Sequence, residues 1–202
     1  MNILQPILEG DQFFFRLING GMSNPIFDVL LPLFRERLFW VPFYLFIVSF
    51  TLLNTGNKKW VILLGLVVTV GLTDATSSRV IKKNVQRIRP CNATELMQDI
   101  RLRVPCGGGY SFTSSHAANH FAVAVFLIVI FGLSGQWQQK AMLVWAGTIA
   151  FSQVYVGVHY PLDVFMGALL GSIIGWSVSK LLLKLLLTFF QDGDDFRPFL
   201  LK

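Results

Sequence analysis

Long apolar stretches alternate with short polar segments along most of the chain. A helix needs about 20 residues to cross a hydrocarbon core of about 30 Å. The chain has stretches of roughly this kind over residues 38–54, 59–82, 114–133, 139–158 and 161–188. This pattern predicts an all-α membrane protein, a bundle of about five transmembrane helices in a single domain over residues 1–202.

The N-terminal segment, residues 1–34, has a different pattern. Charged residues interrupt its apolar run, and it lacks the basic start and clean apolar core of a cleavable signal peptide. We therefore expect an amphipathic segment that lies on the membrane interface, with its helix ended by Asn19, Gly20 and Gly21. The side chains expected to face the acyl chains are those of Phe13, Phe14, Phe15, Leu17 and Ile18.

Three short polar clusters interrupt the apolar stretches. The second stretch turns polar at its end, the third is preceded by polar residues, and the fourth again turns polar at its end. Because consecutive crossings run in opposite directions, these polar ends meet on one side of the membrane. Ionisable groups are costly in such a setting, so a functional site is the expected reason for them. The clusters are Lys82 with Arg89 and Pro90, then Ser114, Ser115 and His116, then Ser152 and Gln153 with His159 and Asp163.

Composition and charge agree with a membrane protein. Hydrophobic residues make up 53% of the chain and charged residues only 14%, and the mean hydropathy is +0.58. The formal net charge of +6 raises the question of nucleic acid as a partner. No basic helix or aromatic-basic platform accompanies that charge, so we expect lipid headgroups and an anionic substrate as the partners, and no nucleic acid.

The second and third clusters contain the parts of a phosphoryl-transfer site. Ser114 stands at the start of a predicted helix, where free backbone N–H groups and the helix dipole favour an anion. Taken alone, Ser114 is an ordinary N-cap. Asp163 follows His159 by one turn across Pro161, so its carboxylate can orient the imidazole and stabilise its cation. His120 lies one turn beyond His116, and we interpret it as a structural residue.

The chain has only two cysteines, Cys91 and Cys106, near the two ends of the long polar loop 86–112. A disulfide between them would close the loop and stabilise it by about 3 kcal/mol. Two unpaired cysteines are the alternative. A disulfide would place this side of the protein in an oxidising compartment. The loop itself is interpreted either as a lid over the site or as a simple connector.

The three clusters together resemble the motifs of the type 2 phosphatidic acid phosphatase family, whose fold is shared with the vanadium haloperoxidases. The family pattern is K-x6-R-P, then P-S-G-H, then S-R-x5-H-x3-D. This chain has Lys82-x6-Arg89-Pro90, then Thr113-Ser114-Ser115-His116, then Ser152-Gln153-x5-His159-x3-Asp163. The order and the internal spacings match, from about the second apolar stretch to the fifth.

The resemblance implies an integral membrane phosphatase that needs no metal and no cofactor. By that resemblance His159 is the nucleophile, Asp163 orients it, and His116 protonates the leaving oxygen and later activates water. The other motif residues would hold the phosphoryl oxygens. These phosphate-binding residues are Lys82, Arg89, Ser114, Ser115 and Gln153.

The chain departs from the family pattern most clearly at Gln153, where the family has a phosphate-binding arginine. Either a neighbouring cation from Arg87, Lys83 or Arg79 takes its place, or the site is weaker or differently selective. For a diphosphate substrate, Arg101 or Arg103 of the loop is a further hypothesis.

Three functions are compatible with the clusters. The leading one is hydrolysis of a lipid phosphate or diphosphate, such as undecaprenyl diphosphate, phosphatidylglycerophosphate, phosphatidate or a lipid A phosphate. The alternatives are a metal-dependent membrane hydrolase using His116, His120, His159 and Asp163, and a non-catalytic transporter or binding protein for an anionic lipid.

The expected location is the bacterial inner membrane, with the site facing the periplasm or the cell exterior. The positive-inside rule does not support that orientation, because only seven of the 17 basic residues then lie on the cytoplasmic side. Gly167, Gly171 and Gly175 form a stripe on the last stretch, for which packing within the bundle and dimerisation are the two interpretations. We expect a monomer or a weak homodimer.

Overall fold

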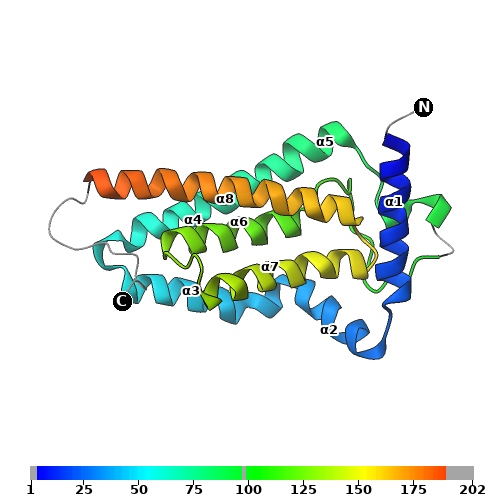
Figure 1. Ribbon diagram of the computed structural model, residues 1–202, viewed down its shortest axis with the longest axis horizontal. Coiled ribbons are helices and arrows are strands. Elements are labelled where there is room, and N and C mark those ends of the chain that lie inside the picture. Colours follow the sequence, from blue (N-terminus) through cyan, green and yellow to red (C-terminus); the bar gives the residue numbers. More distant parts are fainter. Residues whose placement is uncertain (1–3, 97–98, 190–202) are drawn as a thin grey trace.

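The computed structural model describes residues 4–96 and 99–189, and in that part of the chain all regular elements are helical. Figure 1 shows most of them side by side along the long axis, with α1 crossing one end of the bundle. This arrangement confirms the predicted all-α fold. The α-helices are α1 (Leu4–Arg16), α2 (Pro25–Arg35), α3 (Val41–Asn54), α4 (Lys59–Asp74), α5 (Lys82–Val85), α6 (Ser115–Ile130), α7 (Trp137–Tyr155) and α8 (Pro161–Phe189).

Three helical segments in the described part of the chain are long and apolar enough to cross a membrane. They are Arg37–Asn54, Gly56–Asn92 and Pro161–Thr188, and the second joins α4 to α5 through a π-helical segment, Ala75–Ile81. The remaining two predicted crossings correspond to α6 and α7. Helix α6 is apolar but has 16 residues. Both helices bury much of their surface against neighbouring helices, so protein packing shapes their composition as much as lipid does.

The glycine stripe of α8 brings this helix against α6. A Cβ atom on Gly171 would lie 2.0 Å from the carbonyl oxygen of Ala118, and one on Gly175 would lie 2.4 Å from that of Ala122. Only glycine permits so close an approach of two backbones. The stripe is therefore used inside the bundle, as the first of its two interpretations expected. Its consequence for the site is that the first residues of α6 and α8 lie together.

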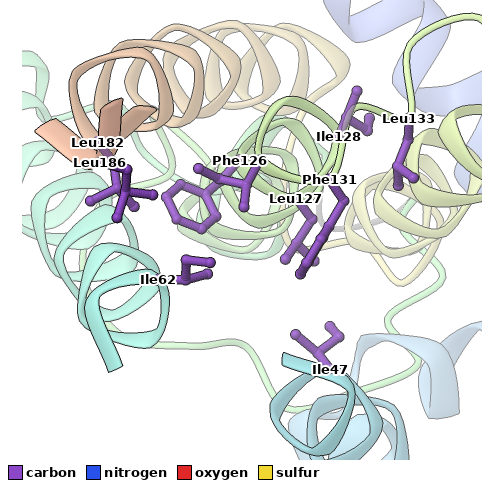
Figure 2. Packing of buried hydrophobic residues seen from close by; sticks show 10 residues of the cluster. Ile47, Ile62, Phe126, Leu127, Ile128, Phe131, Leu133, Leu182 and Leu186 are labelled. Atoms are coloured by element: carbon purple, nitrogen blue, oxygen red, sulfur yellow. The ribbon is translucent and has the colours of Figure 1, made fainter. Parts of the chain in front are cut away.

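The largest buried apolar cluster lies in the half of the bundle away from α1 (Figures 1 and 2). Phe126 of α6 is fully buried and packs with Ile62 of α4 and with Leu182 and Leu186 of α8. Between helices surrounded by lipid, such side chains stabilise the bundle through close van der Waals packing. This cluster joins α4, α6 and α8 and leaves the polar residues to the opposite end.

The outer faces of the long helices carry large apolar side chains that the protein does not cover. Leu64 and Val67 of α4 and Phe165 and Trp176 of α8 are all exposed. An apolar surface of this extent is expected on a protein surrounded by lipid.

Helix α1 differs in part from the prediction for the N-terminal segment. Phe13, Phe14 and Leu17 are exposed, as expected for side chains that face acyl chains. Phe15 was wrongly expected to face lipid. It is 1% exposed and packs against Tyr160 and Val154 at the end of the bundle. The reason is that one side of α1, which carries Phe15 and the buried Asp11, covers protein, while Phe13 and Phe14 lie on the other side.

The loop 86–112 folds over the same end of the bundle. Leu96 is fully buried in the cluster that contains Phe15. Cys91 and Cys106 form the predicted disulfide, with their Cα atoms 5.9 Å apart. The loop is thus a packed part of the fold.

Candidate active site

Asp163 is the centre of the polar end of the bundle. It lies in the first turn of α8, and its side chain is fully buried. Its Oδ1 atom accepts a hydrogen bond from Nη1 of Arg87 at 2.7 Å, and its Oδ2 atom accepts one from the backbone N–H of Tyr160 at 2.9 Å. Its backbone carbonyl accepts a hydrogen bond from the N–H of Ser114 at 2.9 Å. Asp163 therefore connects the starts of α6 and α8 with the segment after α5.

His159 lies between Asp163 and Arg89 and is 2% exposed. Its Nε2 atom is 3.1 Å from Nη1 of Arg89. A guanidinium can only donate, so Nε2 is the acceptor and a neutral ring carries its proton on Nδ1. Nδ1 faces Oδ2 of Asp163 at 3.5 Å, which is longer than a hydrogen bond. The lone pair of Nε2 thus points at a cation, where an incoming phosphoryl group would also be attracted.

Arg89 is held by carbonyl groups of two loops. Its Nη1 donates to the carbonyl of Val158 at 3.1 Å, and its Nε and Nη2 donate to the carbonyls of Gly109 and Gly108 at 3.2 and 3.3 Å. These bonds fix the guanidinium against His159. Much of its donor capacity is already engaged by the protein.

Gln153 is fully buried near the end of α7, and its backbone carbonyl accepts hydrogen bonds from the N–H groups of Val158 and His159, both at 3.2 Å. Its side-chain oxygen and nitrogen make no hydrogen bond to any residue in the described part of the chain. An unpaired buried amide is costly. The side chain of Gln153 therefore offers an unused donor, Nε2, and an unused acceptor, Oε1, close to the turn that carries His159.

The second cluster starts α6. Ser114 is its N-cap, and its Oγ atom accepts a hydrogen bond from the N–H of Ala117 at 3.4 Å. The Oγ atom of Ser115 lies 3.0 Å from that of Ser77 in the π-helical segment, which lies 3.1 Å from Oγ1 of Thr113. Ser77 was not identified from the sequence. The signal for it was a run of polar residues inside an apolar stretch.

His116 and His120 have different surroundings. His116 is half-buried in the first turn of α6, and its ring centroid lies 6.4 Å from that of His120. Both ring nitrogens of His120 are engaged, Nδ1 with the carbonyl of His116 at 2.7 Å and Nε2 with the hydroxyl of Tyr44 at 2.9 Å. This environment supports the structural interpretation of His120.

Lys82 opens α5 and is half-buried. Its ammonium interacts electrostatically with Arg89 and Asp163. The structure therefore brings Lys82, Arg89, His159 and Asp163 into one polar region, together with the start of α6.

Arg87 lies between two buried carboxylates. Its Nη2 donates to Oδ2 of Asp11 at 2.6 Å, while its Nη1 bonds Asp163. The other oxygen of Asp11 accepts a hydrogen bond from the N–H of Leu162 at 2.8 Å. Burial raises the pKa of Asp11, and its bonds with Arg87 and Leu162 act against that rise. Since both ends of Arg87 are engaged in this way, it does not provide a free cation to replace the arginine missing at Gln153.

Asp11 is a site residue that the sequence interpretation missed. It was assigned to an interfacial segment, but its side chain is 7% exposed and contacts the start of α8. A carboxylate among the aromatic residues of an amphipathic helix was the available signal.

The other cations considered for the site are also accounted for. Lys83 and Arg79 are exposed. Arg103 donates to Asp28, to the carbonyl of Tyr155 and to Ser23, so it fastens the loop to the segment between α1 and α2. Arg101 donates to Ser23 at 2.8 Å. Through these contacts the two loop arginines hold the loop 86–112 against the rest of the fold.

An apolar groove of about 800 Å³ lies between α3, α4 and α6. Ile47, Leu66 and Val123 contribute to its apolar walls. Two cations, Arg37 and Arg79, and one carboxylate, Asp74, also line it. It meets the helix that starts with the second cluster at His120, one turn beyond His116. A mostly apolar groove of this kind can hold acyl chains.

The geometry agrees with what known proteins show. The model of the PAP2 superfamily matches residues 58–186, and the chain belongs to this superfamily. It is therefore a membrane lipid phosphate phosphatase of the PAP2 type, as the motifs predicted. The class predicted from the sequence, a phosphatase rather than a non-catalytic binding protein, is confirmed.

Individual relatives support this assignment. The chain is 34% identical over 166 residues to the lipid A 4′-phosphatase of Bacteroides thetaiotaomicron. The alignment covers 79% of this chain and 72% of that protein. It is 28% identical over 160 residues to an undecaprenyl-diphosphatase of Sulfolobus acidocaldarius. That alignment covers 78% of this chain and 71% of that protein. The crystal structure of LpxE from Aquifex aeolicus superposes with a TM-score of 0.63 at 27% identity, over 84% of this chain and 94% of that one.

Proposed function

We propose that the protein removes a phosphate monoester from a lipid A-type glycolipid through a phosphohistidine on His159. The observation that carries the mechanism is the orientation of His159, with Nε2 toward Arg89 and Nδ1 toward Asp163. The observation that favours this lipid is the similarity to the lipid A 4′-phosphatase of Bacteroides thetaiotaomicron. The groove between α3, α4 and α6 offers a place for apolar chains, and it reaches α6 at His120, one turn beyond His116.

The first step forms the phosphoenzyme. The lone pair of Nε2 on His159 attacks phosphorus, and the bond from phosphorus to the lipid oxygen breaks. The bonding pair stays on the departing oxygen, which takes a proton from His116. Asp163 stabilises the positive charge that develops on the imidazole.

The second step releases phosphate. A water oxygen attacks phosphorus and gives a proton to His116, and the N–P bond breaks with its electron pair returning to Nε2. Lys82, Arg89, Ser114, the amide of Ser115 and Gln153 hold the phosphoryl oxygens in both steps. No metal and no cofactor take part.

The metal-dependent alternative is less well supported by these side chains. No group of three or more metal-ligating residues is found in the described part of the chain. His120, which that alternative needs, already uses both ring nitrogens. Activity that survives a strong chelator is expected, and its loss would support the alternative.

We also propose a single domain over residues 1–202, a monomer or weak homodimer, and the inner membrane of a bacterium with the site on the periplasmic or external side. The Cys91–Cys106 disulfide supports this orientation, because disulfides persist in oxidising compartments.

The test is phosphate release by the purified protein in detergent from lipid A, undecaprenyl diphosphate, phosphatidylglycerophosphate and phosphatidate. We expect lipid A to have the highest kcat/KM. His159→Ala should abolish turnover, and His116→Ala should lower kcat by about 10²- to 10⁴-fold. Lys140→Ala, at the opposite end of the bundle, is the control. Full activity in both histidine variants would overturn the mechanism, and a higher kcat/KM for another lipid would change only the substrate.

A further inference from the structure

One arginine near the site lacks a strong partner. Arg35 ends α2, and its side chain is 16% exposed. Its Nε atom is buried and makes no hydrogen bond to any residue that the structure describes. Its guanidinium contacts Glu36 at 3.8 Å, and the side chain of Glu36 is 60% exposed. Burial lowers the pKa of Arg35, yet an arginine keeps its charge at neutral pH. A cation that is buried this far is expected to meet an anion.

Helix α2 packs on the part of α7 that carries Gln153. Leu31 is buried in a cluster with Tyr155 and Val156, and Arg35 follows Leu31 by one helical turn on the same face. The two helices lie next to each other in Figure 1. Arg35 therefore belongs to the face of α2 that is turned toward α7.

Aromatic contacts fix the position of α2 along α7. The ring of Phe27, near the start of α2, lies 5.9 Å from that of Tyr155. Trp40, which follows the end of α2, lies 5.9 Å from Trp145. Arg35 on α2 and Gln153 on α7 both lie between these two contacts, Arg35 nearer the Trp40 end and Gln153 nearer the Tyr155 end.

Arg35 lies within electrostatic range of two residues of the site, His116 and Arg89. These residues belong to α6 and to the segment after α5, whereas Arg35 comes from α2. Arg35 and Arg89 are therefore two like charges within range of each other. Such a pair is stabilised by an anion between or beside its members.

We propose that Arg35 binds the phosphoryl group that is transferred, beside Arg89 and the neutral amide of Gln153. This assignment rests on the proposed function. Arg89 already donates to three carbonyl groups, and Arg87 to two carboxylates. The buried Nε of Arg35, in contrast, makes no hydrogen bond within the described part of the chain, and the ion pair of its Nη1 with Glu36 spans 3.8 Å. Its planar fork matches two oxygens of a phosphate dianion. Arg35 thereby provides the cation that the third motif lacks.

The first measurement is binding of inorganic phosphate, followed as the rise in melting temperature of the detergent-solubilised protein. Phosphate should stabilise the wild type, and Arg35→Gln should weaken phosphate affinity by about 10- to 150-fold, the range for a lost charge-assisted hydrogen bond. Arg35→Lys should fall between the two, because it keeps the charge and loses the fork. Without phosphate, Arg35→Gln should melt no lower than the wild type, since a poorly paired buried charge has been removed.

The second measurement is kcat/KM for each lipid phosphate. Arg35→Gln should lower it by a similar factor for all of them, and methylguanidinium should restore part of the activity of Arg35→Ala. Arg16→Gln is the matched control, because Arg16 is an exposed arginine whose ion pair with Asp99 spans 3.6 Å. Its effect should stay within about twofold.

The outcomes separate the two proposals. Unchanged phosphate affinity in Arg35→Gln overturns this inference even if the enzyme is active. A loss confined to lipids with a second anionic group also overturns it, because Arg35 would then bind that group instead. Phosphate binding that depends on Arg35 in a protein that hydrolyses none of the lipids would support the anion site and refute the proposed function.

Discussion

At the scale of single residues, Asp163 joins more parts of the site than any motif spacing indicates. The spacing of His159 and Asp163 predicted that the carboxylate orients the imidazole. The structure adds that the same carboxylate bonds Arg87 and the N–H of Tyr160, and that its backbone holds the start of α6. The orientation proposed for His159 and the position of the start of α6 thus both depend on one buried residue.

Asp163→Asn should therefore reduce catalysis more than substrate binding. The amide cannot stabilise an imidazolium as a carboxylate does. Its NH2 group would also face a donor, either the guanidinium of Arg87 or the N–H of Tyr160. We expect kcat to fall by about 10²- to 10⁴-fold with a small change in KM. Steady-state phosphate release measures both. Asp99→Asn removes an exposed carboxylate as the control, and a change in KM alone would contradict the assigned role.

Arg87 stabilises the fold of this region because it separates two carboxylates. Arg87→Gln leaves Asp11 and Asp163 buried without their cation, and we expect it to lower the free energy of unfolding by about 3–5 kcal/mol. Burial already raises the pKa of Asp11, and losing Arg87 raises it further. The folded variant then binds a proton more tightly than the unfolded chain, so its stability deficit should shrink as the pH falls through that raised pKa.

Thermal unfolding of both proteins in detergent across a pH series measures this effect. Combining Arg87→Gln with Asp11→Asn removes one of the stranded carboxylates and should recover part of the stability at neutral pH. A deficit that is the same at every pH and is unaffected by Asp11→Asn would contradict the role given to Arg87.

At the scale of elements, the contact between α6 and α8 sets the distance between Ser114 and Asp163. Gly171→Ala places a methyl group where the carbonyl of Ala118 stands, so the helices must move apart. We expect a loss of about 1–3 kcal/mol in stability, accompanied by a fall in kcat. Gly147→Ala in α7 is the matched control, because a Cβ atom there meets nothing within 4 Å. It should be neutral or slightly stabilising.

The sequence predicts the parts of this site that lie on the long helices. Alternating crossings and motif spacing are local properties, and they place Arg89, Ser114, His159 and Asp163 at one end. The parts that it missed come from α1, α2 and the π-helical segment. Asp11 and Arg35 are far from the motifs in sequence, and their place depends on how two N-terminal helices pack across the bundle. No periodicity encodes that packing.

At the scale of the whole molecule, many basic residues of the polar end have a use inside the fold. Ten basic residues lie on the polar side if that side is external, but several of them have internal partners. Arg87 is paired with Asp11 and Asp163, Arg103 with Asp28, and Arg89 with loop carbonyls. The positive-inside rule counts lysine and arginine whether or not they are paired, so it leaves the orientation to other observations.

We therefore expect the end of the bundle that carries the disulfide to face the outside. After reduction, Cys91 and Cys106 are the only native thiols, so a membrane-impermeant maleimide should label intact cells only after treatment with an impermeant reductant. In a chain with both cysteines replaced by serine, Asn57→Cys reports the opposite end, where Asn57 is exposed between α3 and α4. That thiol should react only once the membrane is opened. Labelling of Asn57→Cys in intact cells, with protection of the reduced native pair, would mean that the site faces the cytoplasm and that the disulfide does not form there.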